Sequence, residues 1–344
     1  MKNILLIIFI SFSISQDFDE LYFGSENDLD IMTWNIERFP KNGSITVNYV
    51  TQIISALDMD VIAIQEVDDI GSFNQLLYNL DGYEGYLESS WFAGLAFIYK
   101  TETVEINNIY EIYTTSEYWS PFPRSPMVMD MNFMGENYII INNHYKCCGD
   151  DNLNLNDESD EENRRYMANT LLKEYIEDNL SNENVILLGD LNDNLTDSSS
   201  DNVFQMFLND SENYLFADYE IAQGSISDWS YPSWPSHIDH ILITNELFGV
   251  FEIIETIRID YFMDGGFNDY DQNISDHRPV AIKIASSSNS SGDINNDGFI
   301  NVVDVIVIVN FILNNEYNSA ADLNLDSILD VLDLIDLINI ILHN

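Results

Sequence analysis

The sequence repeatedly places a short polar segment directly after an apolar run of strand length. The polar positions at these places are Asn35, Glu66, Asn143, His144, Asp190, Asn192, Asp239, Asp276 and His277. Because strand ends hold side chains rigidly at one edge of a sheet, we expect these residues to face a common cleft. Carboxylates, carboxamides and imidazoles suit a hard divalent cation and acid–base chemistry on a phosphate.

Strands and helices alternate along most of the chain, which predicts an α/β domain. Apolar periodicity predicts helices over 46–57, burying the face with Ile54, and over 163–178, burying the face with Tyr166 and Leu171. Strands are expected over 31–35, 61–66, 94–100, 127–133, 138–142, 184–189, 238–243 and 279–284. With 344 residues and 46% hydrophobic content, the chain can form one large core and a small further module.

Taken in order, the polar segments resemble the motifs of the endonuclease/exonuclease/phosphatase superfamily. The matching motifs are Trp-Asn at 34–35, Gln-Glu at 65–66, Asn-His at 143–144, Gly-Asp-Leu-Asn-Asp at 189–193, Ile-Asp-His-Ile-Leu at 238–242 and Ser-Asp-His-Arg-Pro-Val at 275–280. The resemblance covers residues 29–285, which we take as the catalytic domain. It implies a four-layer α/β sandwich, with two mixed, mostly antiparallel sheets between helices and the cleft at one end.

The same resemblance implies a ligand set for Mg²⁺ or Mn²⁺. Glu66 matches the family's metal-binding glutamate, Asp276 is a further metal ligand, and Asn35 binds the metal or the substrate phosphate. On an extended segment Asp276 and His277 would point to opposite faces.

Catalytic roles also follow from the resemblance. Asp190 and Asn192, two residues apart, would face the same side and position and deprotonate the attacking water. His277 and His144 would contact the phosphate or transfer a proton. Asp239 would set the tautomer of one of these histidines, and either assignment is open.

The charge is strongly acidic, with 59 Asp and Glu against 12 Lys and Arg, for a formal net charge of −47. A phosphate-backbone binder normally carries a basic surface, so this composition argues against an ordinary duplex nuclease. Either bound cations suffice for a small or flexible phosphoester, or a saline medium screens repulsion beyond about 10 Å. Arg124 resembles the family's Arg-x-Pro element and is a candidate phosphate clamp, the alternative being a surface salt bridge.

A Ser-rich linker over 286–292 precedes a repeat of 29 residues in 293–344. Calcium ligands of the first loop would be Asp293, Asn295, Asp297, Phe299 (through its carbonyl), Asn301 and Asp304. Those of the second loop would be Asp322, Asn324, Asp326, Ile328 (likewise), Asp330 and Asp333. Apolar helices are expected over 302–313 and 331–342. The repeat resembles a type I dockerin module, which implies bound Ca²⁺ and a cohesin partner; a calcium-stabilised cap without a partner is the alternative.

The first 15 residues read as a signal peptide, because a basic residue precedes a short apolar run and small residues follow. Residues 16–28 then form a polar lead-in. We expect an exported protein, with tethering at a cell surface if a cohesin is bound. The adjacent Cys147 and Cys148 are compatible with a strained vicinal disulfide or with two free thiols.

The leading hypothesis is a secreted, monomeric, Mg²⁺-dependent phosphodiesterase that cleaves DNA or RNA. The alternative within the same superfamily is a phosphatase or phospholipase-like hydrolase acting on a small phosphoester, sphingomyelin or an inositol phosphate. A third hypothesis, from another class, is an adhesion or scaffold component whose working part is the C-terminal repeat.

Overall fold

The computed structural model describes residues 18, 20–25, 27–89, 91–285, 292–295, 299–314, 317–318, 321–324, 326 and 328–343. The expected signal peptide, nearly all of the expected linker, and Asp297 lie outside the described residues. Within the described part, no helix is long and apolar enough to span a bilayer.

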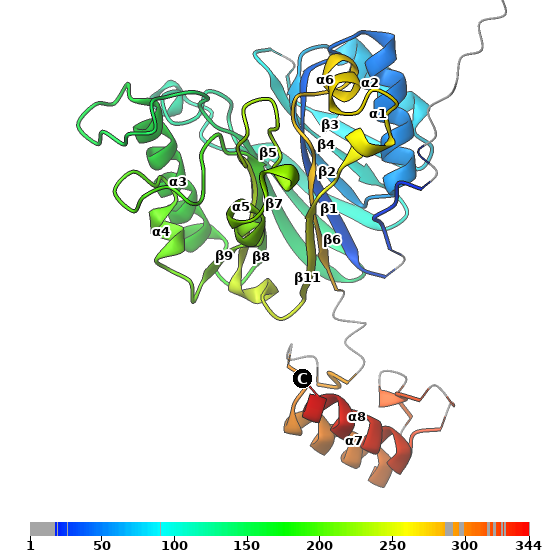
Figure 1. Ribbon diagram of the computed structural model, residues 1–344. Coiled ribbons are helices and arrows are strands. Elements are labelled where there is room, and N and C mark those ends of the chain that lie inside the picture. Colours follow the sequence, from blue (N-terminus) through cyan, green and yellow to red (C-terminus); the bar gives the residue numbers. More distant parts are fainter. Residues whose placement is uncertain are drawn as a thin grey trace, which may run out of the picture.

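Two six-stranded sheets form the centre of the catalytic domain (Figure 1). The first has the order β11-β12-β1-β2-β4-β3, from β1 (Leu29–Phe39), β2 (Val61–Val67), β3 (Tyr83–Leu87), β4 (Gly94–Lys100), β11 (Phe251–Thr256) and β12 (Val280–Ile284). The second has the order β5-β6-β7-β8-β10-β9, from β5 (Val104–Glu111), β6 (Met127–Phe133), β7 (Glu136–His144), β8 (Asn184–Asp190), β9 (Tyr214–Phe216) and β10 (Asp239–Thr244). Only β1–β2 and β7–β8 are parallel among the described pairs, so the predicted mixed, mostly antiparallel sheets are confirmed.

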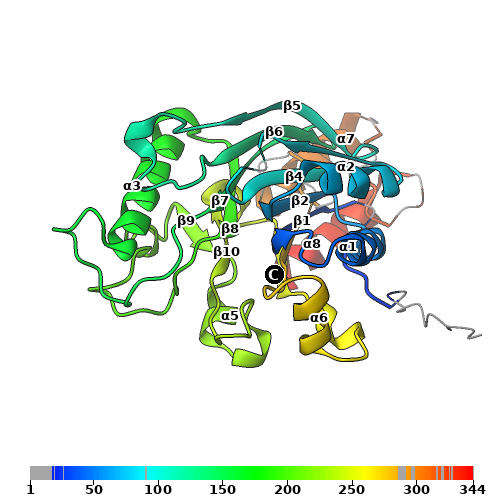
Figure 2. The same cartoon turned by 90° about the horizontal axis from the view of Figure 1, so that it is seen from above.

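Helices lie on the outer faces of the two sheets, as the view from above shows (Figure 2). They are α1 (Ser44–Leu57), α2 (Ile70–Asn79) and α6 (Phe267–Asn273) on the first sheet, and α3 (Glu161–Asn179), α4 (Gln205–Leu208) and α5 (Tyr219–Gln223) on the second. Short 3₁₀ helices occupy Ser116–Tyr118, Ile226–Asp228, Asn245–Leu247 and Ile259–Phe262. The aspartates before α2 and α3 act as N-caps, because the side chain of Asp69 accepts from the Ser72 N–H and that of Asp160 from the Asn163 N–H.

The strands are almost continuously apolar because both faces of each sheet are covered. In β1, Ile31 packs between the sheets, whereas the neighbouring Met32 and Trp34 pack under α1 and α2. This alternation follows from the two-residue period of a strand. The face predicted for α1 is confirmed, since Val50, Ile53, Ile54 and Leu57 are all fully buried.

The face predicted for the second long helix packs against the core but is not the most deeply buried face of that helix. Tyr166 and Leu171 of α3 are only partly buried, and the buried face carries Glu162, Arg165 and Asn169 together with apolar residues. Hydrophobic periodicity misplaces this face because the buried polar groups are paired with one another and with neighbouring loops, which offsets the cost of their desolvation.

The expected polar lead-in also differs from the prediction. Phe18, Leu21 and Phe23 are buried in the core under the first sheet, and the Gly24 N–H donates to the Leu57 carbonyl at 2.9 Å. The segment therefore contributes to the packing of the catalytic domain.

Residues 293–344 contain two helices, α7 (Val302–Asn314) and α8 (Val331–His343), which pack around Ile308 and Leu337. The 29-residue repeat reappears in the hydrogen bonds. Asp304 accepts from the N–H groups of residues 294, 295 and 301, and Asp333 accepts from those of residues 323, 324 and 330. Both aspartates are fully buried at the start of their helices.

Candidate active site

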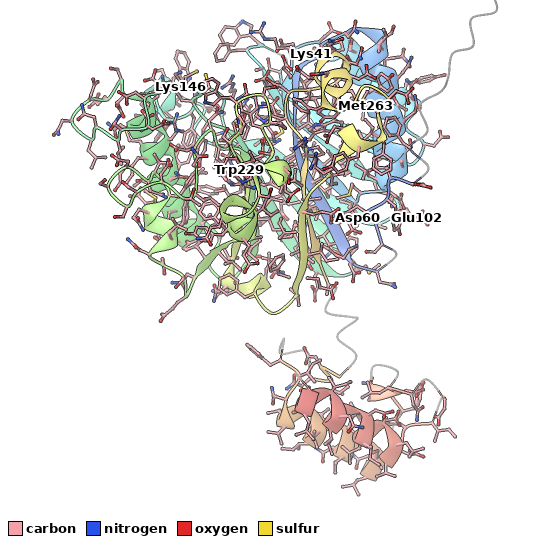
Figure 3. The ribbon with its side chains drawn as sticks, viewed as in Figure 1. Lys41, Asp60, Glu102, Lys146, Trp229 and Met263 are labelled. Carbon is pink, nitrogen blue, oxygen red and sulfur yellow. The ribbon has the colours of Figure 1, made fainter. Side chains whose placement is uncertain are left out.

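The parallel strand pairs end at one edge of the domain and bring the polar segments together. In the register of the second sheet, Asp190 at the end of β8 lies between His144 on β7 and Asp239 on β10. In the first sheet, Asn35 on β1 pairs with Gln65 on β2, next to Glu66. Figure 3 shows Lys41 and Lys146 at this end of the domain and Asp60 and Glu102 away from it.

These strand ends line a cleft of about 870 Å³. Its predicted members are Glu66, His144, Asp190, Asn192, Asp276 and His277. The cleft also contains residues that we did not predict, among them Glu37, Arg165, Asp193, Tyr231 and Trp234. Six of the nine expected residues therefore line one cleft, whereas Asn35, Asn143 and Asp239 are buried and do not line it.

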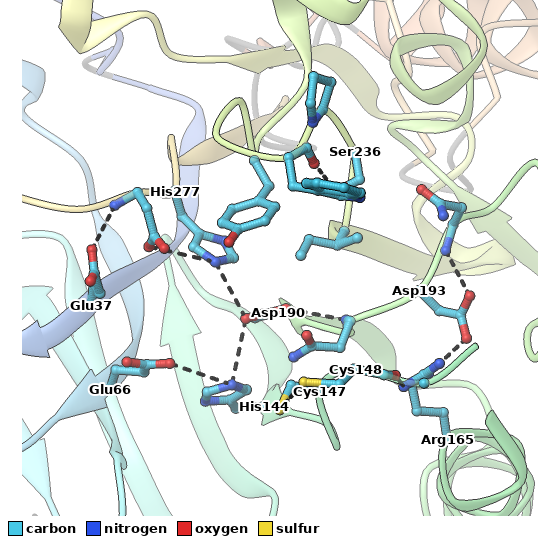
Figure 4. A pocket seen from close by; sticks show the side chains of 18 of the residues that line it. Glu37, Glu66, His144, Cys147, Cys148, Arg165, Asp190, Asp193, Ser236 and His277 are labelled. Atoms are coloured by element: carbon cyan, nitrogen blue, oxygen red, sulfur yellow. Dashed lines mark hydrogen bonds and ion pairs between the residues drawn. The ribbon is translucent and has the colours of Figure 1, made fainter. Parts of the chain in front are cut away.

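Asp190 is the centre of the cleft (Figure 4). Its Oδ2 accepts from Asn35 Nδ2 at 2.9 Å and lies 3.5 Å from His144 Nε2 and 3.8 Å from His277 Nε2. Burial raises the pKa of Asp190 to about 7; the charge of His277 opposes this rise and that of Asp239 adds to it.

Asp239 contacts His277 rather than His144. Its Oδ2 lies 2.8 Å from His277 Nδ1. Burial alone would lower the pKa of His277, but the carboxylates of Asp239 and Asp190 outweigh burial and raise it to about 10. The imidazole of His277 is therefore held in its charged form, with Nε2 directed into the cleft.

His144 has the opposite electrostatic character. Burial lowers its pKa well below the ordinary value, and the positive charges of Arg124 and His277 lower it further. Its Nε2 lies 3.8 Å from Glu66 Oε1, and within the described residues its Nδ1 has no hydrogen-bond partner. His144 is therefore a neutral imidazole, suited to donating a hydrogen bond from Nε2.

Asp276 and His277 do not point to opposite faces, because their segment bends before β12. The His277 N–H donates to Ser275 Oγ at 3.0 Å, and His277 Nε2 lies 3.9 Å from Asp276 Oδ1. The Asp276 N–H donates to Glu37 Oε2 at 3.1 Å. Burial raises the pKa of Asp276 to about 6; His277 opposes this rise, whereas the charge of Glu37 adds to it. Glu37 was missed; its signal was a carboxylate two residues after Asn35.

Glu66 projects into the cleft from a β-bulge at the end of β2. Its φ of 67° lies in the left-handed region, which is strained for a side chain with a Cβ. Oε2 accepts from the Arg38 N–H at 3.0 Å, and Oε1 accepts from Asn35 Nδ2 at 3.3 Å. The bulge directs this carboxylate toward Asn35 and His144.

The close approach of β8 to β7, before the segment that carries Asp190 and Asn192, requires glycine at position 189. A Cβ at this position would lie 1.9 Å from the Asn143 carbonyl oxygen, so only glycine fits between β7 and β8. The Asn192 N–H donates to Asp190 Oδ1 at 3.1 Å, and its side chain donates to the Tyr145 carbonyl at 3.4 Å. Asp190 and Asn192 thus line the same cleft, as predicted.

A buried network behind Asp190 was missed by the sequence analysis. Asp218 Oδ2 lies 2.6 Å from His240 Nδ1 and 3.0 Å from His237 Nε2. His240 Nε2 lies 2.8 Å from the carbonyl of Asp193. Because that carbonyl and the Asp218 carboxylate only accept, His240 carries protons on both nitrogens. Sequence separation concealed this network, since Asp218 lies outside every motif.

Both imidazoles of this network have both nitrogens engaged, since His237 Nδ1 accepts from the Ser230 N–H at 3.2 Å. The cluster of Asp218, His237 and His240 therefore leaves no free nitrogen for a metal. We assign it a positioning role: it fixes the turn that carries Asp193.

We expect His240→Gln to lower the free energy of unfolding by about 3–5 kcal/mol, because it leaves Asp218 as a buried charge without its cation. Burial opposes the raised pKa of His240, but the Asp218 carboxylate outweighs it. A raised pKa stabilises the fold fully below the ordinary histidine value of about 6.5, and this contribution is lost as pH rises through the folded value.

Urea unfolding at increasing pH from about 6.5 should therefore show the gap between wild type and His240→Gln becoming smaller. His237→Gln is the matched control, because it preserves the Asp218–His240 pair and should cost less. A gap that widens with pH would contradict this account of the network.

A second buried ion pair shapes the side of the cleft. Arg165 Nε donates to Asp193 Oδ2 at 2.7 Å, and its Nη1 donates to the carbonyls of Lys146 and Cys148 at 2.8 and 2.7 Å. This guanidinium joins α3 to the loops after β7 and β8. Cys147 and Cys148 are free, exposed thiols beside it.

Arg124 lies at the border of the cleft. It donates from Nη1 to the carbonyl of Tyr145 and from Nε to that of Phe92, both at 3.4 Å. Within the described residues it forms no ion pair, so the salt-bridge alternative is not observed. Burial lowers the pKa of Arg124, and the carboxylates of Glu66 and Asp190 oppose that change.

The donor set of the cleft fits a hard divalent cation. Glu66, Asp190 and Asp276 supply carboxylate oxygens on one surface. Asp239 Oδ1 is buried without a hydrogen-bond partner among the described residues. Repulsion among close carboxylates is what a bound cation relieves.

Comparison with known proteins gives the family. The profile described as Endonuclease/Exonuclease/phosphatase family matches residues 32–277, and the chain belongs to this family. Its members hydrolyse phosphoesters with divalent metals, and the chain carries candidate metal-binding groups. Among curated proteins, none matches the chain significantly.

Solved structures share the fold at low sequence identity. Danio rerio TDP2 in complex with a single-stranded DNA product has 13% identity and a TM-score of 0.59, covering 76% of this chain and 100% of its own. The human Nocturnin catalytic domain with bound sulfate has 17% identity and a TM-score of 0.55, covering 75% and 94%. A mannosyl-6-phosphatase from Bacteroides thetaiotaomicron has 14% identity and a TM-score of 0.54, covering 75% and 100%.

Proposed function

We propose that the catalytic domain is a divalent-metal-dependent phosphodiesterase that hydrolyses DNA or RNA. The observation that supports this proposal most strongly is the arrangement around Asp190. A buried carboxylate with a raised pKa lies between the charged His277 and the neutral His144, next to Glu66 and Asn35. These groups can accept a proton from water and stabilise phosphoryl oxygens at the same place.

Each residue has a separate role in this proposal. Asp190 Oδ2 accepts a proton from the attacking water, while Asn192 and Asn35 hold the Asp190 carboxylate and the substrate in position. His277 Nε2–H donates to a phosphoryl oxygen, and Asp239 keeps it charged. His144 donates a hydrogen bond from Nε2 toward the phosphate or the leaving oxygen.

Glu66 and Asp276, with Asn35, would hold Mg²⁺ or Mn²⁺. When bound, the cation supplies Lewis-acid polarisation of the phosphoryl group and neutralises its negative charge. Arg124, which lacks a carboxylate partner among the described residues, would bind an oxygen of the phosphate.

The test is a substrate panel with the purified protein in Mg²⁺, with Ca²⁺ present, at low and high salt. It comprises single- and double-stranded DNA, RNA, bis-p-nitrophenyl phosphate and a phosphomonoester. Cleavage of the polymers, lost on chelation of the metal, is the expected result. Turnover of the phosphomonoester alone would contradict the proposal.

A phosphatase or phospholipase-like hydrolase acting on a small phosphoester is the second candidate. The observation that favours it is the net charge of −47, which repels a nucleic-acid backbone. One structurally similar protein is a mannosyl-6-phosphatase. If polymer cleavage increases with salt, the acidity reflects a saline medium; cleavage of small esters only would favour this second candidate.

We further propose that the chain is exported and that residues 293–344 form a dockerin-like module that binds two Ca²⁺ ions and a cohesin. The carboxylates of Asp304 and Asp333 accept hydrogen bonds from equivalent backbone N–H groups, which supports two loops of the same structure. Both copies also expose apolar residues at matching positions, namely Phe299 and Ile328, Val302 and Val331, Val303 and Leu332, Ile306 and Ile335, and Leu313 and Leu342. Matching apolar faces suit a protein partner.

Calorimetric titration of the full chain with Ca²⁺ tests the loops. Asp304→Asn is expected to remove one bound Ca²⁺ relative to wild type, because position 12 of the loop supplies a ligand carboxylate. Asp336→Asn, on α8 outside the loops, is the control. Equal Ca²⁺ stoichiometry in wild type and Asp304→Asn would exclude the first calcium loop.

A further inference from the structure

A groove rich in aromatic residues lies beside the catalytic cleft. We call it the aromatic groove; its main residues are Trp91, Phe92, Trp119, Phe122, Arg124 and Arg164. It has a volume of about 480 Å³. The Trp91 and Trp119 side chains are 85% and 64% exposed.

The backbone holds two of these aromatic side chains outward. Phe92 and Ala93 have φ angles of 62° and 59°, in the left-handed region that bulky residues avoid. At Gly94, a Cβ would lie 2.0 Å from the Ser89 carbonyl oxygen. This tight turn keeps Trp91 and Phe92 next to each other, with ring centroids 6.0 Å apart.

Arg124 connects the aromatic groove with the cleft. Its guanidinium lies 4.8 Å from the Phe92 ring centroid and donates to the carbonyl of Tyr145, the residue after His144. A ligand leaving the cleft past His144 would therefore meet Arg124 and then the rings.

The distribution of unpaired cations also points to this path. Among the described basic residues, only Arg38, Arg124 and Arg164 lack an ion pair with a described carboxylate. Arg38 lines the cleft, and the other two line the aromatic groove. In a chain with 59 acidic residues, three unpaired guanidinium groups in this one region favour an external anion as their partner.

We propose that the aromatic groove binds single-stranded nucleic acid next to the scissile phosphate. Bases stack on Trp91 and Trp119, Arg164 binds a flanking phosphate, and Arg124 binds the scissile phosphate where the aromatic groove meets the cleft. The proposal rests on the proposed nuclease function and names its substrate as single-stranded. Unpaired bases can turn toward exposed rings, whereas a duplex keeps its bases stacked and would bring two charged backbones to an acidic surface.

Binding is measured in the full chain carrying Asp190→Asn, so that no turnover occurs. Fluorescence anisotropy compares a labelled oligothymidylate with an abasic strand of equal length. Adding Trp91→Ala or Trp119→Ala is expected to weaken oligothymidylate binding about tenfold, as for a lost base–aromatic stack, and to leave abasic binding unchanged. Arg164→Gln should weaken the binding of both strands. Tyr78→Ala, which removes an exposed aromatic side chain on α2, should weaken the binding of neither strand.

Three results would overturn the proposal. The first is equal affinity for the two strands. The second is binding of neutral phosphatidylcholine vesicles that is lost in Trp91→Ala while oligonucleotide binding is retained, which would mark a membrane contact. The third is unchanged oligothymidylate binding in Trp91→Ala. Because the assay needs no catalysis, it is separate from the substrate panel. A protein that cleaves nucleic acid although Trp91→Ala changes nothing would refute the groove and keep the proposed function.

Discussion

Asp190→Asn is expected to lower kcat on a phosphodiester by about a thousandfold or more, because a carboxamide accepts no proton from water. Asp190 lies within 4 Å of Asn35, His144 and His277, so the substitution removes a carboxylate that faces all three. Kinetics at saturating Mg²⁺ measure the effect.

A stability measurement distinguishes loss of the catalytic base in Asp190→Asn from simple unfolding of the variant. Because burial raises the pKa of Asp190 to about 7, folding disfavours its ionised form, and the resulting cost in stability grows from the unfolded pKa of about 3.9 and is complete above about pH 7. A neutral Asn should therefore leave the melting temperature unchanged or higher. Asp81→Asn, at an exposed loop position, serves as the control. Activity near that of wild type in Asp190→Asn would refute the assigned base.

The second large loss of activity is expected for Asp239→Asn. An amide cannot stabilise the imidazolium of His277, and it favours the wrong ring tautomer. Loss of such a partner costs about 10²–10⁴ in kcat. The pKa of His277, raised to about 10 mainly by Asp239 and Asp190 against burial, should fall.

The pH dependence of activity is also expected to change in Asp239→Asn. Activity that needs the charged imidazole is lost as pH rises through the pKa of His277, so the variant's residual activity should fall off at a lower pH than that of wild type. Titration of the His277 ring by NMR tests the cause independently. An unchanged pKa in Asp239→Asn would show that this contact does not hold the charge.

Strands that continue without interruption could be predicted closely from the sequence. β4 and β6 match the expected 94–100 and 127–133, and α1 matches its predicted face. β3, β5 and β11 were missed because their sides are partly exposed and their apolar periodicity is low. β9 was missed because it has only three residues. The buried face of α3 was misjudged because its polar residues are paired only in the folded state.

The sequence by itself determined which chemistry is available: the residues at the strand ends, their order, and the acidic composition are local properties of the chain. Only the tertiary structure decided which groups meet. It paired Asp239 with His277 rather than His144, placed Asp218 against His240, and turned Asp276 and His277 into one cleft. The physical reason is that hydrogen bonds and charge interactions depend on distances of a few ångströms between residues far apart in sequence. Strand register and bends, rather than residue type, set those distances.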